Sequence, residues 1–136
     1  MNPFMEVASA IQLAVAPAFL LTGIGATLTV MTNRLARIID RFRVLNELRS
    51  KLNNEDIIEL SLLRLRAKWT HWAIALTTLS ALLTCIVIAS IFIGTEIQFN
   101  FDQFIVFLFI GAMSFLILGL LCFTREVTLS KNVVRP

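Results

Sequence analysis

Residues 33–69 read NRLARIIDRFRVLNELRSKLNNEDIIELSLLRLRAKW, a charged segment between two long apolar runs. Within it, apolar side chains recur every three or four residues among Arg, Asp and Glu, which is the spacing of amphipathic helices that pack as a coiled coil. Two such series approach each other and mirror about Asn53-Asn54, so that Leu45 faces Leu62 and Phe42 faces Leu65. The pattern predicts an antiparallel coiled-coil hairpin that turns at the two asparagines.

The predicted seam of this hairpin continues outward into both apolar runs. On the first helix it comprises Leu21, Ile24, Leu28, Met31, Leu35, Ile38, Phe42 and Leu45, and on the second Leu62, Leu65, Trp69, Trp72, Leu76, Leu79, Leu83 and Ile86. Further out, Met31 is expected to meet Leu76. Because nearly every residue of the apolar runs is hydrophobic, the register is decided by the charged segment, where the seam residues alternate with charges.

The composition indicates a membrane protein. Hydrophobic residues make up 57% of the 136 residues, whereas soluble domains usually hold roughly 45–50%. Three uncharged stretches, at about 7–33, 69–95 and 104–124, are each long enough to cross a hydrocarbon core of about 30 Å as a helix. We therefore predict an all-α integral membrane protein of three transmembrane helices. Residues 1–136 form a single membrane unit, with a cytoplasmic helical hairpin at about 34–68.

The distribution of basic residues predicts the orientation. Nine of the twelve Lys and Arg lie between the first and second stretches, and the other three, Arg125, Lys131 and Arg135, follow the third. Residues 1–33 and 94–103 contain none. Since Lys and Arg near a membrane stay on the cytoplasmic side, the N-terminus is expected outside, with the hairpin and C-terminus in the cytoplasm.

A face of small and polar residues lies opposite the seam of the first helix. It consists of Ala18, Thr22, Gly25, Ala26, Thr29 and Asn33. Small residues let membrane helices approach closely, and Thr and Asn form hydrogen bonds between them. The face is interpreted either as a packing surface, against the third span or another subunit, or as the wall of a pore in an oligomer.

Three arginines follow the first span at helical spacing. Arg34, Arg37 and Arg41 lie where anionic lipid headgroups are expected, and each basic residue near such a surface gains about 1 kcal/mol. They are interpreted as contacts for anionic lipids, as signals that set the orientation, or as both.

The sequence offers no catalytic constellation. It contains one His, no metal-ligand spacing, no nucleophile with a base and no glycine-rich phosphate loop. We expect neither an enzyme nor a cofactor, and no nucleic-acid partner.

Two segments resemble a known bacterial family. They are IQLAVAPAFLLTGIG at residues 11–25 and TNRLARIIDR at residues 32–41. Both look like the small membrane proteins filed as domain of unknown function 2721. The resemblance implies a location in the bacterial inner membrane and three spans, and it implies no activity.

Two functions remain open from the sequence. The first is a non-enzymatic homo-oligomer, in its most concrete form a small ion channel lined by the first helix. The alternative is a membrane scaffold or regulatory subunit whose hairpin docks a cytoplasmic protein. The alternative requires exposed apolar residues on the hairpin, such as Ile39, Ile57 and Leu60.

Overall fold

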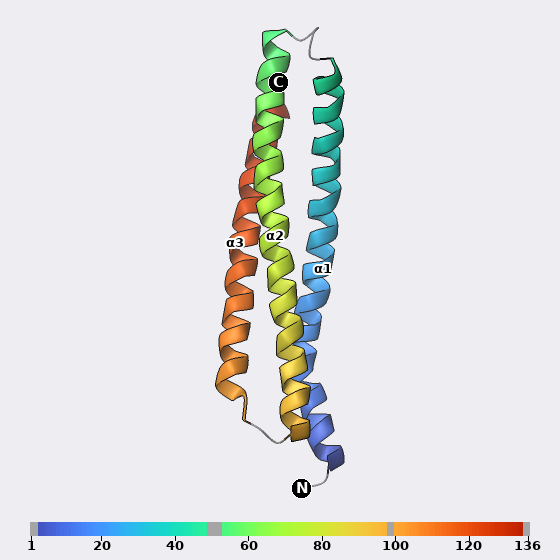
Figure 1. The fold of residues 1–136 in the computed structure, drawn as a ribbon, viewed down its shortest axis with the longest axis vertical. Coiled ribbons are helices and arrows are strands. Elements are labelled where there is room, and N and C mark those ends of the chain that lie inside the picture. The colour runs from blue at the N-terminus through green and yellow to red at the C-terminus, as the bar shows by residue number, and fades with distance from the viewer. Residues whose placement is uncertain (1–2, 49–52, 98–99, 135–136) are drawn as a thin grey trace.

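The computed structural model contains three long helices, α1 (Pro3–Glu47), α2 (Asn54–Ile97) and α3 (Asp102–Val134) (Figure 1). It describes the backbone of residues 3–48, 53–97 and 100–134, and the side chains of residues 4–48, 53–97 and 100–129. All three helices are long and apolar enough to cross a membrane. The predicted all-helical class with three candidate membrane spans is therefore confirmed.

An asparagine caps the helix that follows each of the two connections. The side-chain Oδ1 of Asn53 accepts a hydrogen bond from the backbone N–H of Asp56 at 3.0 Å, which satisfies one of the donors left open at a helix N-terminus. Asn100 does the same for the backbone N–H of Asp102 at 3.1 Å. Of the predicted hairpin turn, Lys51 and Leu52 lie outside the described residues, as does Arg49. The side chains of Lys131 and Arg135 also lie outside them.

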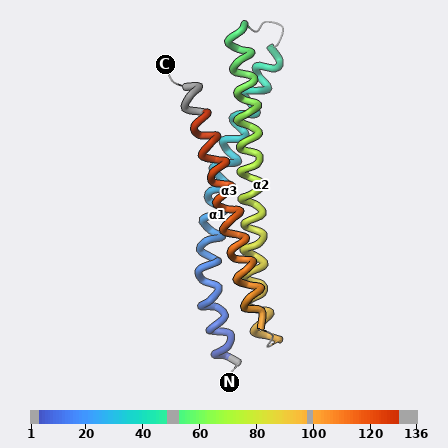
Figure 2. The backbone as a smooth tube through the Cα atoms, turned by 90° about the vertical axis from the view of Figure 1, so that its left-hand side faces the viewer, coloured from blue at the N-terminus to red at the C-terminus, as the bar shows by residue number. Residues whose placement is uncertain are grey.

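The second helix is the centre of the molecule. It packs against both α1 and α3, while α1 and α3 make only slight contact with each other. Figure 1 shows the three helices side by side with α2 in the middle, and Figure 2 shows the α1–α2 pair extending past the end of α3. With 45 and 44 residues, α1 and α2 are each about 65 Å long at 1.5 Å per residue, about twice the hydrocarbon thickness of a bilayer.

The buried face of α1 repeats every seven residues. At this spacing lie Ala10, Pro17, Ile24, Met31, Ile38 and Leu45, and Ala14 is buried beside them. Four of these belong to the seam predicted from the sequence, and Leu35 and Phe42 beside them are half-buried. This interval of seven keeps one stripe of a long helix turned toward its neighbour.

The buried face of α2 differs from the prediction. It consists of Leu63, Thr70, Ala73, Thr77, Ser80, Thr84, Val87 and Ser90. Of the predicted seam residues, Leu62 and Trp69 are half-buried, whereas Leu65 and Trp72 are 42% and 54% exposed. Leu79 and Ile86 are also exposed.

The difference amounts to one position along the helix. Thr77, the residue after Leu76, meets Met31, with its hydroxyl 3.7 Å from the Met31 Sδ. The Arg64 guanidinium, next to Leu65 in the chain, lies 5.5 Å from the centre of the Phe42 ring, so the level predicted for Phe42 is kept. The facing levels are thus close to those predicted, but the buried stripe of α2 follows the predicted seam by one residue and contacts α3 as well as α1. Lipid accepts large apolar side chains as readily as a protein interior does, so small residues rather than large ones mark the buried face.

Candidate functional site

A buried carboxylate joins the three helices. Glu126 of α3 is fully buried, and its Oε2 accepts a hydrogen bond from the Nε of Arg34 in α1 at 2.9 Å. Its Oε1 accepts one from the Nε of Arg66 in α2 at 3.2 Å. We call Arg34, Arg66 and Glu126 the charge triad. Each helix contributes one member, so the triad fixes the relative height of all three.

The triad lies where the apolar runs end. Arg34 directly follows the first predicted span, Arg66 precedes the second by three residues and Glu126 follows the third by two. The side chain of Arg34 is 32% exposed and that of Arg66 is 15% exposed, so both cations keep some contact with their surroundings. A buried carboxylate without partners would be strongly disfavoured. The guanidinium groups of Arg34 and Arg66 compensate the negative charge of Glu126.

An aromatic ring completes the environment of Arg34. The guanidinium carbon of Arg34 lies 5.6 Å from the centre of the Phe123 ring in α3, within the range of a cation–π interaction. Phe123 precedes Glu126 by three residues and therefore lies on the same face of α3. Arg34 is thus the principal link between α1 and α3, which otherwise touch little.

Glu126 was missed from the sequence. It stands next to Arg125 beyond the third apolar stretch, where it looks like an ordinary boundary charge. The feature of the sequence that could have identified Glu126 is its negative charge. It is the sole carboxylate that follows the third stretch, and the charges at the facing ends of the other two helices are Arg and Lys. A carboxylate at this level is favoured where it meets those cations.

A polar cleft lies next to the triad, between α1 and α2. Its volume is about 170 Å³, and Arg37, Arg41, Glu59 and Arg66 line it together with apolar side chains. Glu59 accepts hydrogen bonds from the Nε of Arg41 at 3.0 Å and from its Nη2 at 3.5 Å. The hydrogen bond and the charge of Glu59 raise the pKa of Arg41 above its usual value. We call this the arginine cleft.

The three arginines predicted to contact anionic lipid therefore have different surroundings. Arg34 belongs to the charge triad, and Arg41 is paired with Glu59. Arg37 is exposed, and it makes no ion pair within the part of the chain that the structure describes. A single stripe of three equivalent cations is thus not what the fold presents.

The small-residue face of α1 is uncovered in the structure. Ala18, Thr22, Gly25, Ala26, Thr29 and Asn33 are all exposed, and a side chain added at Gly25 would meet nothing within 4 Å. The hydroxyls of Thr22 and Thr29 donate to the carbonyls of Ala18 and Gly25, at 3.1 and 3.0 Å. In the structure α3 packs on α2 and leaves this face uncovered.

The charged hairpin has a small core of its own. Ile38, Leu45 and Leu63 are buried together, and Phe42 and Leu60 pack against them. Leu60, predicted to be exposed for a partner, therefore contributes to this core. Ile39 and Ile57, by contrast, are 42% and 51% exposed.

The opposite end of the bundle holds a larger cleft. It has a volume of about 790 Å³, and its lining includes the carboxylates Glu6 and Asp102 and the hydroxyl of Ser90. Among the described residues, no three His, Cys, Asp or Glu side chains gather in a way that would hold a metal ion.

The comparisons with known proteins identify a family. No curated protein and no solved structure matches the chain. A family model described as "Protein of unknown function (DUF2721)" matches residues 14–135. The matched region includes the small-residue face of α1, the arginine cleft and all three members of the charge triad. The chain therefore belongs to the DUF2721 family, as its resemblance to that family suggested.

Proposed function

We propose that this chain is a non-enzymatic membrane protein that self-associates through the small-residue face of α1. Its most concrete form is a small homo-oligomeric ion channel lined by α1. The observation that supports the proposal is that every residue of this face, from Ala18 to Asn33, is exposed within the chain. A helix that packs on only one side has a second surface for another copy.

The proposal includes a placement in the bacterial inner membrane. The N-terminus lies outside, the C-terminus lies in the cytoplasm, and the α1–α2 pair continues into the cytoplasm as an antiparallel coiled coil. The distribution of Lys and Arg supports this orientation. The heptad spacing of the buried α1 residues, through Ile38 and Leu45, supports a coiled coil beyond the lipid.

The chemistry of the face favours contact with protein. Gly25, Ala18 and Ala26 leave α1 without bulk, so a neighbouring backbone can come close and gain van der Waals contact that lipid tails do not supply as well. The hydroxyls of Thr22 and Thr29 already donate within their own helix, so they need no outside acceptor when they are buried. Self-association therefore leaves no hydroxyl donor unpaired.

The same hydroxyls suit the wall of a narrow channel. An oxygen that donates to its own helix keeps lone pairs that can accept a hydrogen bond or contact a cation. Thr22, Thr29 and Asn33 follow each other along one side of α1, and several copies with this side at a common axis would form a polar path through the lipid.

Two glycine variants test the self-association. Gly25 lies on the small-residue face and Gly23 lies about 160° away around the helix at 100° per residue; both are open. Gly25→Leu is expected to reduce the oligomeric fraction in liposomes severalfold, measured by counting photobleaching steps of a fluorescent label. Gly23→Leu, the matched control, should leave the fraction unchanged. A monomeric wild-type protein, or an equal effect of both variants, rejects the proposal.

Ion flux tests the channel form separately. In liposomes with a potassium gradient, the wild-type protein is expected to conduct, and Thr22→Phe and Thr29→Phe should lower the flux because they narrow the path. An oligomer that shows no flux would retain self-association and remove the channel.

A second candidate is the scaffold, and a specific observation favours it. The hairpin exposes apolar side chains outside the predicted membrane spans. Among them are Ile39, Ile57 and Ile58, the last of which is 68% exposed. Such residues suit a helix-in-groove contact with a cytoplasmic protein. A ring whose centre is filled by lipid would favour this function over the channel.

A further inference from the structure

The arginine cleft has an excess of positive charge and space for a ligand. Three arginines, Arg37, Arg41 and Arg66, line it against one carboxylate, Glu59. Its volume of about 170 Å³ is more than ten times the roughly 10–15 Å³ that one water molecule requires. The cleft is therefore large enough for a group such as a phosphate.

The donors of the cleft are only partly used. Arg41 is held by Glu59 through two nitrogens, and Arg66 uses its Nε for Glu126. The terminal nitrogens of Arg66, and the whole guanidinium of Arg37, make no hydrogen bond to any residue that the structure describes. A guanidinium carries five N–H donors in a planar fork, which matches the oxygens of a phosphate.

The depth of the cleft agrees with the layer of lipid headgroups. Arg34 marks the end of the first apolar run, and Arg37 and Arg41 lie three and seven residues beyond it, or about 5 and 10 Å along the helix. The polar layer of a bilayer is about 5–7 Å thick on each side. If Arg34 lies at the edge of the hydrocarbon core, Arg37 is expected at the level of the phospholipid phosphates.

We propose that the arginine cleft binds a phosphate group through Arg37 and Arg66, and that the group belongs to an anionic phospholipid. Arg66 links this site to the charge triad, because the same guanidinium bonds Glu126 of α3. A bound headgroup would therefore rest on the point where the three helices meet. The proposal does not depend on self-association.

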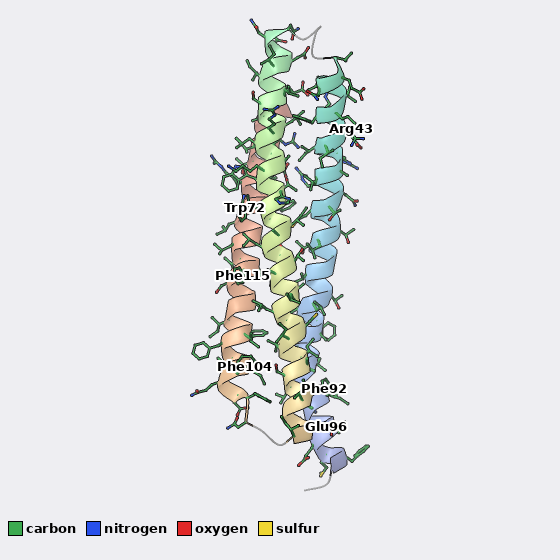
Figure 3. All side chains as sticks on the ribbon, in the orientation of Figure 1. Arg43, Trp72, Phe92, Glu96, Phe104 and Phe115 are labelled. Atoms are coloured by element: carbon green, nitrogen blue, oxygen red, sulfur yellow. The ribbon has the colours of Figure 1, made fainter. Side chains whose placement is uncertain are left out.

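The test uses two arginine variants of the full-length protein. Arg37→Gln removes the unpaired guanidinium from the cleft, whereas Arg43→Gln removes an equal charge from the side of α1 that faces away from α2 (Figure 3). Binding of phosphatidylglycerol and phosphatidylcholine is measured by native mass spectrometry from detergent. We expect the wild type to prefer phosphatidylglycerol. Arg37→Gln should weaken that binding about fivefold, the factor for about 1 kcal/mol per basic residue, and Arg43→Gln less than twofold.

A second measurement distinguishes the source of the phosphate. Inorganic phosphate is titrated calorimetrically into the wild type and both variants. A preference for phosphatidylglycerol that depends on Arg37 supports the lipid, whereas phosphate binding that depends on Arg37, without a preference among lipids, assigns the site to a soluble anion. Equal losses in Arg37→Gln and Arg43→Gln would indicate attraction by net charge alone and overturn the proposal. The proposal would also be overturned if the wild type bound neither phosphatidylglycerol nor inorganic phosphate. Helicity and melting temperature of Arg37→Gln should match the wild type, because Arg37 is exposed.

Discussion

Glu126 shows why one carboxylate can organise a small membrane protein. It lies at the end of the third apolar run, where the sequence changes from apolar to charged, and it is completely buried. The cost of that burial is offset by Arg34 and Arg66, at 2.9 and 3.2 Å. Because these partners belong to two other helices, a local charge pair becomes a constraint on the arrangement of the whole bundle.

Removal of the Glu126 charge should therefore destabilise the fold. Glu126→Gln keeps the shape of the side chain but leaves two guanidinium groups without a counter-charge. Its expected cost is about 2–3 kcal/mol, less than the about 3–5 kcal/mol of a fully buried pair, because both arginines are partly exposed. The free energy of unfolding in detergent micelles measures the change. Arg125→Gln alters an exposed neighbour and should change it by less than about 0.5 kcal/mol.

A double-mutant cycle isolates the contact itself. If Arg66 and Glu126 interact as their geometry indicates, Arg66→Met with Glu126→Met should cost less than the sum of the two single changes, because no charge of that pair is then left unmatched. Strict additivity would contradict a direct interaction between them.

At the level of helices, α2 and α3 pack closely because small residues meet. The hydroxyl of Ser80 donates to the carbonyl of Ala112 at 2.6 Å. A Cβ added at Gly119 would lie 2.5 Å from the hydroxyl of Thr77 and 3.2 Å from the carbonyl oxygen of Ala73. The second of these atoms belongs to the backbone and cannot easily move. Gly119 thus sets the distance between the two helices.

A pair of Gly→Ala changes tests this packing. Gly119→Ala is expected to destabilise the protein by about 1–3 kcal/mol, as overpacking of a well-packed contact does. Gly111→Ala is the control, since its Cβ would make only an ordinary contact of 3.6 Å with Leu83. It should be neutral or stabilising by up to about 1 kcal/mol, because alanine favours a helix more than glycine does. Unfolding in micelles measures both. Equal effects would show that Gly119 does not limit the approach of the helices.

The same packing explains what the sequence could predict. The α1 stripe contains large side chains, such as Ile24, Met31 and Ile38, so the spacing of apolar residues located it. The buried stripe of α2 is made largely of Thr, Ser and Ala, while the larger Leu65 and Trp72 lie outside it. Figure 3 shows Trp72 on the α3 side of α2. In lipid, hydrophobicity does not distinguish an inward from an outward face, so the helices and their levels were predictable from the sequence and the face of α2 was not.

For the whole molecule, the basic residues and the charge triad lie at the same boundary, the one between the apolar runs and the charged end of the bundle. The basic residues define the side expected in the cytoplasm, and Arg34, Arg66 and Glu126 mark the level at which the apolar runs of all three helices end. The α1–α2 pair continues past this level and beyond the end of α3 (Figure 2). The orientation of the hairpin therefore decides which compartment any partner of the exposed Ile39 and Ile57 must occupy.

Cysteine labelling in spheroplasts tests this orientation. Native Cys85 and Cys122 are unpaired, so Cys85→Ala and Cys122→Ala provide the background. Asn54→Cys places a thiol at the start of α2, and Gln103→Cys places one at the start of α3; both positions are exposed. A maleimide that cannot cross the inner membrane should label Gln103→Cys in spheroplasts, and Asn54→Cys only after lysis, because α2 carries the chain from one side to the other. The reverse pattern would invert the proposed topology, and labelling of both before lysis would mean that α2 does not span the bilayer.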